Sequence, residues 1–265
     1  MANPAFAPFR IGYAMNIHDD TTGRFSALGS ISEVFAETTR KEWFLHQSIF
    51  ASLPSESVVP LLAEAELVHF KRKHRLFAQG EAVRHFLILG SGCVRVERDM
   101  GTRRVPLPIR GPGDCVGETA LDAQYHHAHE TVTTLSDIQA LAVPMNALAH
   151  FAAQDAQLRK VLFAELDQGR LRAEYWLESL LSLDVEGRIA QVLTDALARF
   201  CEPHAMGKLI AAPLTHADLA GLIGSTRETV TLTLGKMKRA GVIDFYKRRV
   251  VVRDDNALKR CLTAA

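Results

Sequence analysis

Apolar positions change period along the chain and divide it into three regions. Between about Leu67 and Val143, short runs of β-forming residues alternate with glycine turns every 8–12 residues or so, which is typical of an all-β sandwich or barrel. Strand alternation then places six side chains in the core: Phe86, Ile88, Val94, Val96, Val132 and Leu141. Residues before this region lack any clear period, and we expect residues 1–50 to be a partly disordered extension. The alternative is a short amphipathic helix over residues 40–50.

A helical period replaces this pattern from Asp155 to Leu183. Apolar or small residues recur at alternating spacings of four and three: Leu162, Leu166, Gly169, Ala173, Trp176 and Leu180. This repeat is typical of a coiled-coil seam, so we predict a dimerisation helix, with core packing inside a monomer as the alternative. Asp184 is the expected N-cap of a second amphipathic helix over residues 185–200.

The last part of the chain predicts a short helix, a glycine turn, a longer helix and a β-hairpin. Thr215 and Asp218 have nearly the spacing and chemistry of a capping box before a helix over 216–222. Gly224 permits a tight turn, and Ser225 or Thr226 then caps a helix that ends near Ala240. A hairpin across residues 246–248 adds a basic wing. Together these elements predict a winged helix-turn-helix, with a simple helical hairpin as the alternative.

Composition excludes several classes of protein. The 265 residues are 48% hydrophobic and 23% charged, which argues against a disordered chain, and no apolar run approaches the ~20 residues that span a bilayer. The four cysteines show no CxxC spacing, which argues against a zinc finger and favours a reducing compartment. No secretory signal or common catalytic motif is found. We therefore expect a cytoplasmic protein that has no membrane partner and is not an enzyme.

The net charge of +1 conceals a basic C-terminal region. Between Met206 and Arg253 there are nine basic and three acidic residues, a local charge of +6. Such a patch is typical of a nucleic-acid-binding surface. In a major groove, Arg227 can donate two hydrogen bonds to guanine and Glu228 can accept one from cytosine. We expect the remaining contacts to reach phosphates, from Thr215, Ser225, Thr226, Thr229, Thr231, Lys236, Lys238, Lys247 and Arg248.

Three segments resemble the CRP/FNR family of bacterial transcription regulators. The run GSTRETV at 224–230 resembles the family's recognition motif. The run FAQGEAVRHFLILGSGCVRVERDMG is similar to its β-roll, and RGPGDCVGETAL at 110–121 to its phosphate-binding cassette. The resemblance implies an α+β fold: a cyclic-nucleotide-binding-like β-roll (a jelly-roll) over 51–154, a dimerisation helix over 155–183 and a winged helix-turn-helix over 184–265. It also implies a homodimeric regulator that reads a pseudo-palindromic operator and contacts RNA polymerase.

Two positions depart from the family pattern. In members that bind cyclic AMP, an arginine of the cassette neutralises the cyclic phosphate, and here that position is Ala128. The resemblance places the effector pocket at Gly117, Glu118, Thr119, Ala120, Ala128 and His129. With Ala128 and the acidic Glu130 in this cassette, we expect no functional cyclic-AMP site and predict no cofactor. Family members often carry a further arginine in the recognition helix, where this chain has Leu232.

Other side chains permit weaker hypotheses. His126, His127 and His129 could form a metal, haem or pH sensor, but we favour an exposed polar loop and predict no metal. Cys93 and Cys115 fit a structural role better than redox sensing. The alternative function is an effector-binding or haem- or redox-responsive interaction module of the same fold, with weak or no DNA binding.

Overall fold

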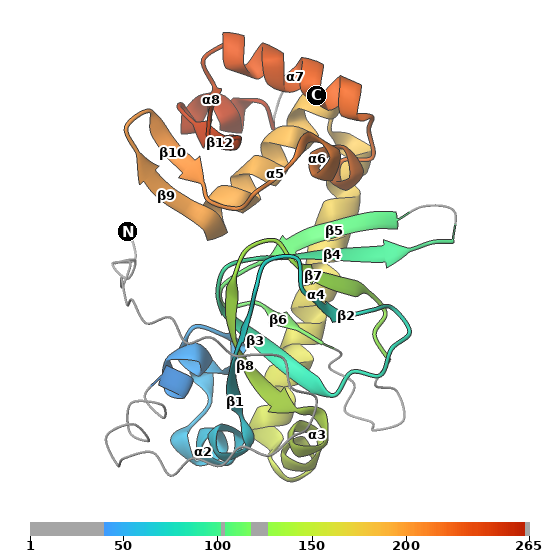
Figure 1. Ribbon diagram of the computed structural model, residues 1–265, viewed down its shortest axis with the longest axis vertical. Helices are drawn as coiled ribbons and strands as arrows, with labels where there is room; N and C mark the ends of the chain where they lie inside the picture. Colours follow the sequence, from blue (N-terminus) through green and yellow to red (C-terminus); the bar gives the residue numbers. More distant parts are fainter. Residues whose placement is uncertain (1–39, 102–103, 118–126, 263–265) are drawn as a thin grey trace.

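The computed structural model describes residues 40–101, 104–117 and 127–262. A β-roll lies at one end of the molecule and a winged helix at the other, and one long helix, α4, runs between them (Figure 1). The roll, the long helix and the winged helix follow one another along the chain in the predicted order.

Two antiparallel four-stranded sheets form the roll. The first has the order β1-β8-β3-β6, with bounds Glu66–Phe70, Ile138–Pro144, His85–Ser91 and Cys115–Val116. The second has the order β2-β7-β4-β5, with bounds Arg75–Phe77, Thr131–Thr134, Val94–Asp99 and Arg104–Arg110. All six predicted core side chains are buried, so the inward-facing set inferred from alternation is confirmed.

Strand β3 is buried on both faces. Leu87 and Leu89 pack with the second sheet, whereas Phe86 and Ile88 pack against helices on the opposite side. These helices are a segment over residues 40–46, the 3-10 helix η1 (Ile49–Ser52), α2 (Ser55–Glu64) and α3 (Met145–Gln154). The segment over residues 40–46 agrees with the alternative of a short helix within 40–50, whereas η1, α2 and α3 were not predicted. A strand buried on both faces reads as a continuous apolar run, as HFLILG does here.

The predicted boundary of the N-terminal extension at residue 50 is wrong. Phe44, Leu45 and Phe50 are almost fully buried in the core of the roll. The Phe44 ring lies over Gly90 of β3, where a Cβ atom would come within 2.1 Å of the ring. The packed unit therefore includes residues 40–50, because this aromatic layer covers the second face of β3.

Helices α4 (Ala156–Ser182) and α5 (Val185–Phe200) each begin at an aspartate. The Asp155 carboxylate accepts hydrogen bonds from the amides of Gln157 and Leu158, and Asp184 accepts one from Gly187. The predicted Asp184 cap is confirmed, and it marks the point at which the chain turns from the long helix into the winged helix.

The predicted dimer seam on α4 is partly wrong. Leu162 is 0% exposed because it fills the core of the roll, so it cannot contact a second copy. Trp176 and Leu180 are half-buried against their own chain. The exposed apolar stripe lies on a neighbouring face of the helix and consists of Phe163, Leu166, Ala173, Leu177 and Leu181. Only Leu166 and Ala173 of the predicted seam belong to it.

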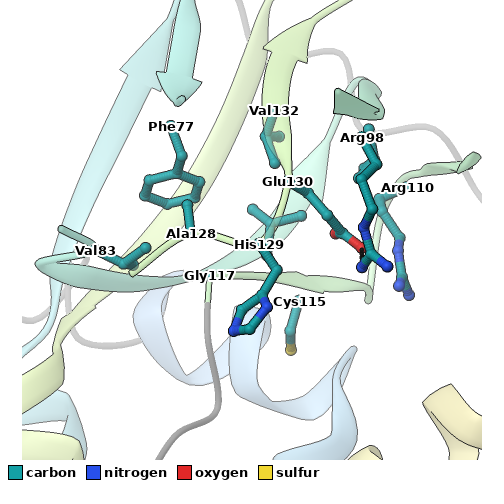
Figure 2. Close-up of a pocket in the computed structure, with 12 residues that line it drawn as sticks. Phe77, Val83, Arg98, Arg110, Cys115, Gly117, Ala128, His129, Glu130 and Val132 are labelled. Atoms are coloured by element: carbon teal, nitrogen blue, oxygen red, sulfur yellow. Dashed lines mark hydrogen bonds and ion pairs between the residues drawn. The ribbon is translucent and has the colours of Figure 1, made fainter. Parts of the chain in front are cut away.

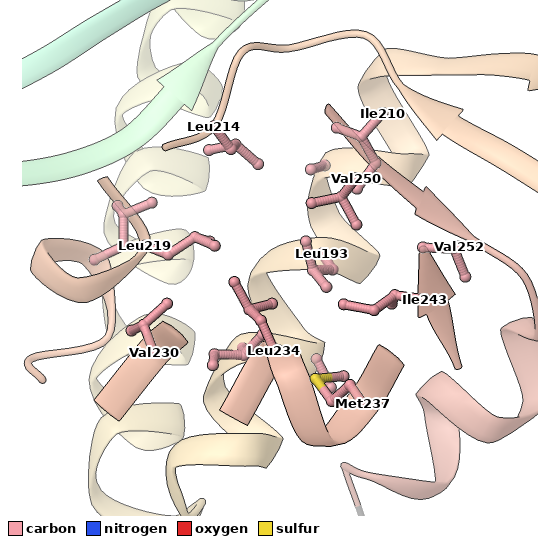
Figure 3. Close-up of a cluster of buried hydrophobic side chains, with 14 of the residues drawn as sticks. Leu193, Ile210, Leu214, Leu219, Val230, Leu234, Met237, Ile243, Val250 and Val252 are labelled. Carbon is pink, nitrogen blue, oxygen red and sulfur yellow. The ribbon is translucent and has the colours of Figure 1, made fainter. Parts of the chain in front are cut away.

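The winged helix is built on its own four-stranded sheet and apolar core (Figure 3). The sheet has the order β11-β12-β10-β9, with bounds Ile243–Tyr246, Arg249–Val252, Gly207–Ile210 and Cys201–His204. Helices α6 (His216–Leu222), α7 (Arg227–Arg239) and α8 (Asp255–Arg260) complete it. Residues 201–210 form the β9–β10 hairpin of this sheet.

Replacing Phe44 tests whether residues 40–50 belong to the folded unit. Phe44→Ala should lower the free energy of unfolding by about 3–5 kcal/mol, because it leaves a cavity against β3. Urea denaturation followed by circular dichroism measures this loss. The control Glu42→Ala, at an exposed position of the same helix, should stay within about 0.5 kcal/mol of the wild type. Equal stability of the two variants would contradict the assignment.

Candidate nucleic-acid interface

The first helix of the candidate interface, α6, begins at a complete capping box. The Thr215 hydroxyl accepts a hydrogen bond from the Asp218 amide at 3.1 Å, and the Thr215 amide donates to Asp218 Oδ2 at 2.9 Å. These reciprocal bonds satisfy two amides that would otherwise lack partners at the helix start. The predicted cap at Thr215 is confirmed, and it places the Thr215 side chain at the exposed end of α6.

A glycine turn connects α6 to the recognition helix α7. Gly224 has a φ of +63°, a conformation that glycine adopts at little cost. Thr226 then caps α7, because its hydroxyl accepts a hydrogen bond from the Thr229 amide at 3.1 Å. Arg227 and Glu228 form the first turn of α7, and both are exposed. The two side chains predicted to read bases therefore project from the end of the helix that would enter a groove.

Burial of one face of α7 sets which side chains point outward. Val230, Leu234 and Met237 are at most 1% exposed and pack into the core of the winged helix (Figure 3). On the outer face, Thr231 is exposed, and Leu232 is 69% exposed. Leu232 thus presents an apolar side chain where the family pattern often has an arginine.

His216, which the sequence predicts as a surface or phosphate contact, helps to order this outer face. Nδ1 of His216, at the start of α6, lies 2.9 Å from the Thr231 hydroxyl, which also donates to the Arg227 carbonyl at 2.8 Å. The imidazole also stands near the Phe245 ring of the wing strand β11. His216 therefore connects α6, α7 and the wing. No sequence pattern revealed this, because the three elements are separated by turns.

The wing carries an exposed basic turn between β11 and β12. Lys247 and Arg248 have φ values of +45° and +66°, as the tight turn of a two-residue hairpin requires. The Lys247 ammonium lies 5.3 Å from the centroid of the Tyr246 ring. Both basic side chains are exposed, as predicted for residues that contact phosphates.

The other predicted phosphate contacts lie around α7 at different positions. Ser225 and Thr229 are half-buried near its start, and Lys236 is exposed in its last turn. Lys238 is also in the last turn, where its ammonium pairs with Asp244 at 2.8 Å and lowers the pKa of that carboxyl. Part of the positive charge of Lys238 is therefore already neutralised within the protein.

A pocket of about 300 Å³ opens in the roll (Figure 2). Of the predicted effector residues, Gly117, Ala128 and His129 line it, whereas Glu118, Thr119 and Ala120 lie outside the described residues. Ala128 is buried, and its backbone pairs with Gly80 and Glu81. The apolar walls include Phe77, Val83, Val96 and Val132.

Two arginines that sequence analysis did not assign to the pocket line it as well. Arg98 of β4 pairs with Glu130 at 3.1 Å, and Arg110 of β5 stands beside them. The negative charge of Glu130, which sequence analysis treated as an added repulsion for a phosphate, is thus largely offset. The sequence alone offers little sign of this arrangement, because Arg98 comes from a strand before the cassette and Arg110 is only the first residue of the cassette run.

The candidate metal and redox residues are spread out. His127 forms an isolated β-bridge with Ala82, His129 lines the pocket, and His126 lies outside the described residues. Within residues 40–101, 104–117 and 127–262, no three His, Cys, Asp or Glu side chains group to hold a metal ion. Burial raises the pKa of the Cys93 thiol and, more strongly, that of Cys115. This favours the unreactive thiol form.

Comparison with known proteins identifies both halves of the chain. The Crp-like helix-turn-helix domain matches residues 187–261, and the cyclic nucleotide-binding domain matches residues 67–155. No helix in the described part of the chain is both long and apolar enough to cross a bilayer.

Relatives match over most of their length. The transcriptional regulator LdrP of Thermus thermophilus is 31% identical over 72% of this chain and 94% of its own. The CRP-like cAMP-activated global transcriptional regulator of Mycobacterium tuberculosis is 28% identical over 80% of this chain and 95% of its own. A crystal structure of a CRP-family regulator from Thermus thermophilus superposes with a TM-score of 0.63 at 25% identity, covering 75% of this chain and 97% of that one. The chain belongs to the CRP/FNR family, whose members are transcription regulators and not enzymes.

Proposed function

We propose that this protein is a homodimer that binds a pseudo-palindromic operator through α7. The observation that carries the proposal is the exposed Arg227–Glu228 pair on the first turn of a helix whose opposite face is fully buried. A guanidinium and a carboxylate held on a rigid helix end can together recognise a G·C pair. Two such helices related by a dimer axis would enter successive major grooves about 34 Å apart.

Leu232 modifies the expected operator. Its exposed side chain offers an apolar contact, such as one with a thymine methyl group, instead of a hydrogen bond to guanine. We therefore propose that the half-site differs from the standard family half-site at the base pair that Leu232 faces. RNA polymerase is the protein partner we propose, on the strength of the family alone.

Arg227 provides the test of base recognition. Operators are first selected by the full-length protein from a pool of random duplexes and confirmed by electrophoretic mobility shift. Arg227→Ala should then cost about 1–3 kcal/mol of binding free energy and relax the preference at one base pair of each half-site, because a bidentate contact is lost.

Lys247→Ala is the matched control for this experiment. Because Lys247 would contact phosphate, its loss should weaken binding to all duplexes alike and reduce the slope of log affinity against log salt by about 1. If the wild type selects no sequence and binds no duplex at low salt, an interaction module without DNA binding becomes the correct interpretation. An absorption spectrum of the same purified protein would reveal haem.

The exposed stripe on α4 provides the test of dimerisation. Leu177→Asp places a charge in the centre of the stripe and should weaken self-association by at least about thirtyfold, as expected for a central interface side chain. Sedimentation equilibrium measures the change. Leu171→Asp is the control, because Leu171 is exposed on another face of the same helix and its replacement should leave the dimer intact. Equal effects of the two substitutions would contradict this interface.

The roll pocket provides a test of effector class. We propose that it does not bind cyclic AMP, although the Mycobacterium tuberculosis relative is named as cAMP-activated. Loss of the charge-assisted contact at Ala128 should weaken cyclic-AMP binding about ten- to a hundredfold. Isothermal titration calorimetry should therefore detect no micromolar binding, and a micromolar dissociation constant would contradict the proposal. The roll then either senses another signal or serves as a fixed scaffold.

A further inference from the structure

The winged helix and the roll share a single apolar cluster. Cys93, at the start of β4 in the roll, is buried among the core residues of the winged helix. Ile109 of β5 and Leu135, which follows β7, pack against the same cluster. The two units are therefore docked together by apolar packing and not joined by the α4–α5 connection alone.

Two glycines allow side chains of one unit to lie directly against the backbone of the other. A Cβ atom on Gly221 of α6 would lie 2.3 Å from Cγ of Pro106 on β5. A Cβ atom on Gly111, just after β5, would lie 2.2 Å from the Phe200 ring at the end of α5. Any larger side chain at either position would force the surfaces apart, so their fit depends on glycine.

An ion pair joins the docked surfaces at the start of the helix-turn-helix. Arg95 Nη2 of β4 lies 2.5 Å from Asp218 Oδ1 of α6, and the side chains are only 30% and 11% exposed. The other carboxylate oxygen, Oδ2, accepts from the Thr215 amide and hydroxyl. A single carboxylate thus closes the capping box of α6 and binds the roll, so that one residue connects the two units.

The contact between the roll and the winged helix leaves the predicted DNA-binding side chains of α7 and the wing uncovered. Figure 1 shows α6 beside β5, with α7 on the far side of the winged helix from the roll. Arg227, Glu228, Lys247 and Arg248 are all exposed in this arrangement. Docking therefore holds the recognition helix in one orientation without blocking its access to DNA.

We propose that Arg95 is a positioning residue for DNA recognition. Through Asp218, it fixes the angle of each recognition helix relative to the roll and hence to the dimer axis. This inference rests on the proposed function, because it concerns two copies of α7 that read one operator. When the two recognition helices of a dimer are held rigidly, the second helix has a high effective concentration at its half-site for one spacing of the half-sites. At other spacings this effective concentration is low. The Arg95–Asp218 pair thus determines spacing selectivity and does not itself contact bases.

The test uses full-length protein and the selected operator, with the half-sites at the selected spacing and with one or two base pairs inserted or removed. Arg95→Ala should weaken binding at the selected spacing about five- to tenfold and flatten the dependence on spacing. Binding to a duplex with a single half-site should be unchanged, because base contacts are preserved. Arg95→Lys, which keeps the charge, should largely restore the spacing profile.

Lys71→Ala is the matched control, since Lys71 makes an ion pair with Asp137 at 3.0 Å within the roll. It should retain the wild-type spacing profile. An unaltered profile for Arg95→Ala overturns the proposal, and so does tighter binding at the selected spacing, which would indicate that docking is inhibitory. Equal losses on single and paired half-sites also overturn it, because they indicate a folding defect. Failure of the wild type to select any operator instead refutes the proposed function.

Discussion

Burial of one face of α7 sets the orientation of the side chains on its outer face. Val230, Leu234 and Met237 anchor that face in a core shared with α5, α6 and the sheet. Because a helix is rigid, fixing three inward side chains also fixes the directions of Arg227, Glu228 and Leu232. Hydrogen bonds to Thr215 and Thr226 stabilise the starts of α6 and α7, and the contact between His216 and Thr231 joins the two helices on the outer face.

Packing contacts also fix the position of the winged helix relative to the rest of the chain. α4 is anchored in the roll by Leu158 and Leu162, and the winged helix is docked back onto the roll by the Cys93 cluster and the Arg95–Asp218 pair. The orientation of the recognition helix thus depends on contacts both within the winged helix and between it and the roll. Strands β4 and β5 contact α6, and α6 contacts α7, so the roll and the recognition helix are joined by a continuous set of contacts.

The pocket of the roll shows how a family site can change its chemistry. Ala128 occupies the position where the family pattern has an arginine, but Arg98 and Arg110 still supply positive charge from neighbouring strands. Arg98 is paired with Glu130, so its charge is neutralised within the chain, whereas Arg110 adds a further positive charge to the lining.

The local features of this protein can be predicted from its amino-acid pattern. Alternation identified Phe86 and Val94 as core residues, while caps and glycines placed α5, α6 and α7, because these signals arise from neighbours along one strand or helix. The folded chain was needed to learn that Leu162 packs inward, that Phe44 belongs to the roll, and that Arg95 contacts Asp218. A helical seam can face either a partner or the chain's own core, and an ion pair between residues more than a hundred positions apart leaves no local pattern. The physical reason is that periodicity reveals which face of an element is buried, whereas the identity of what buries it depends on how distant segments come together.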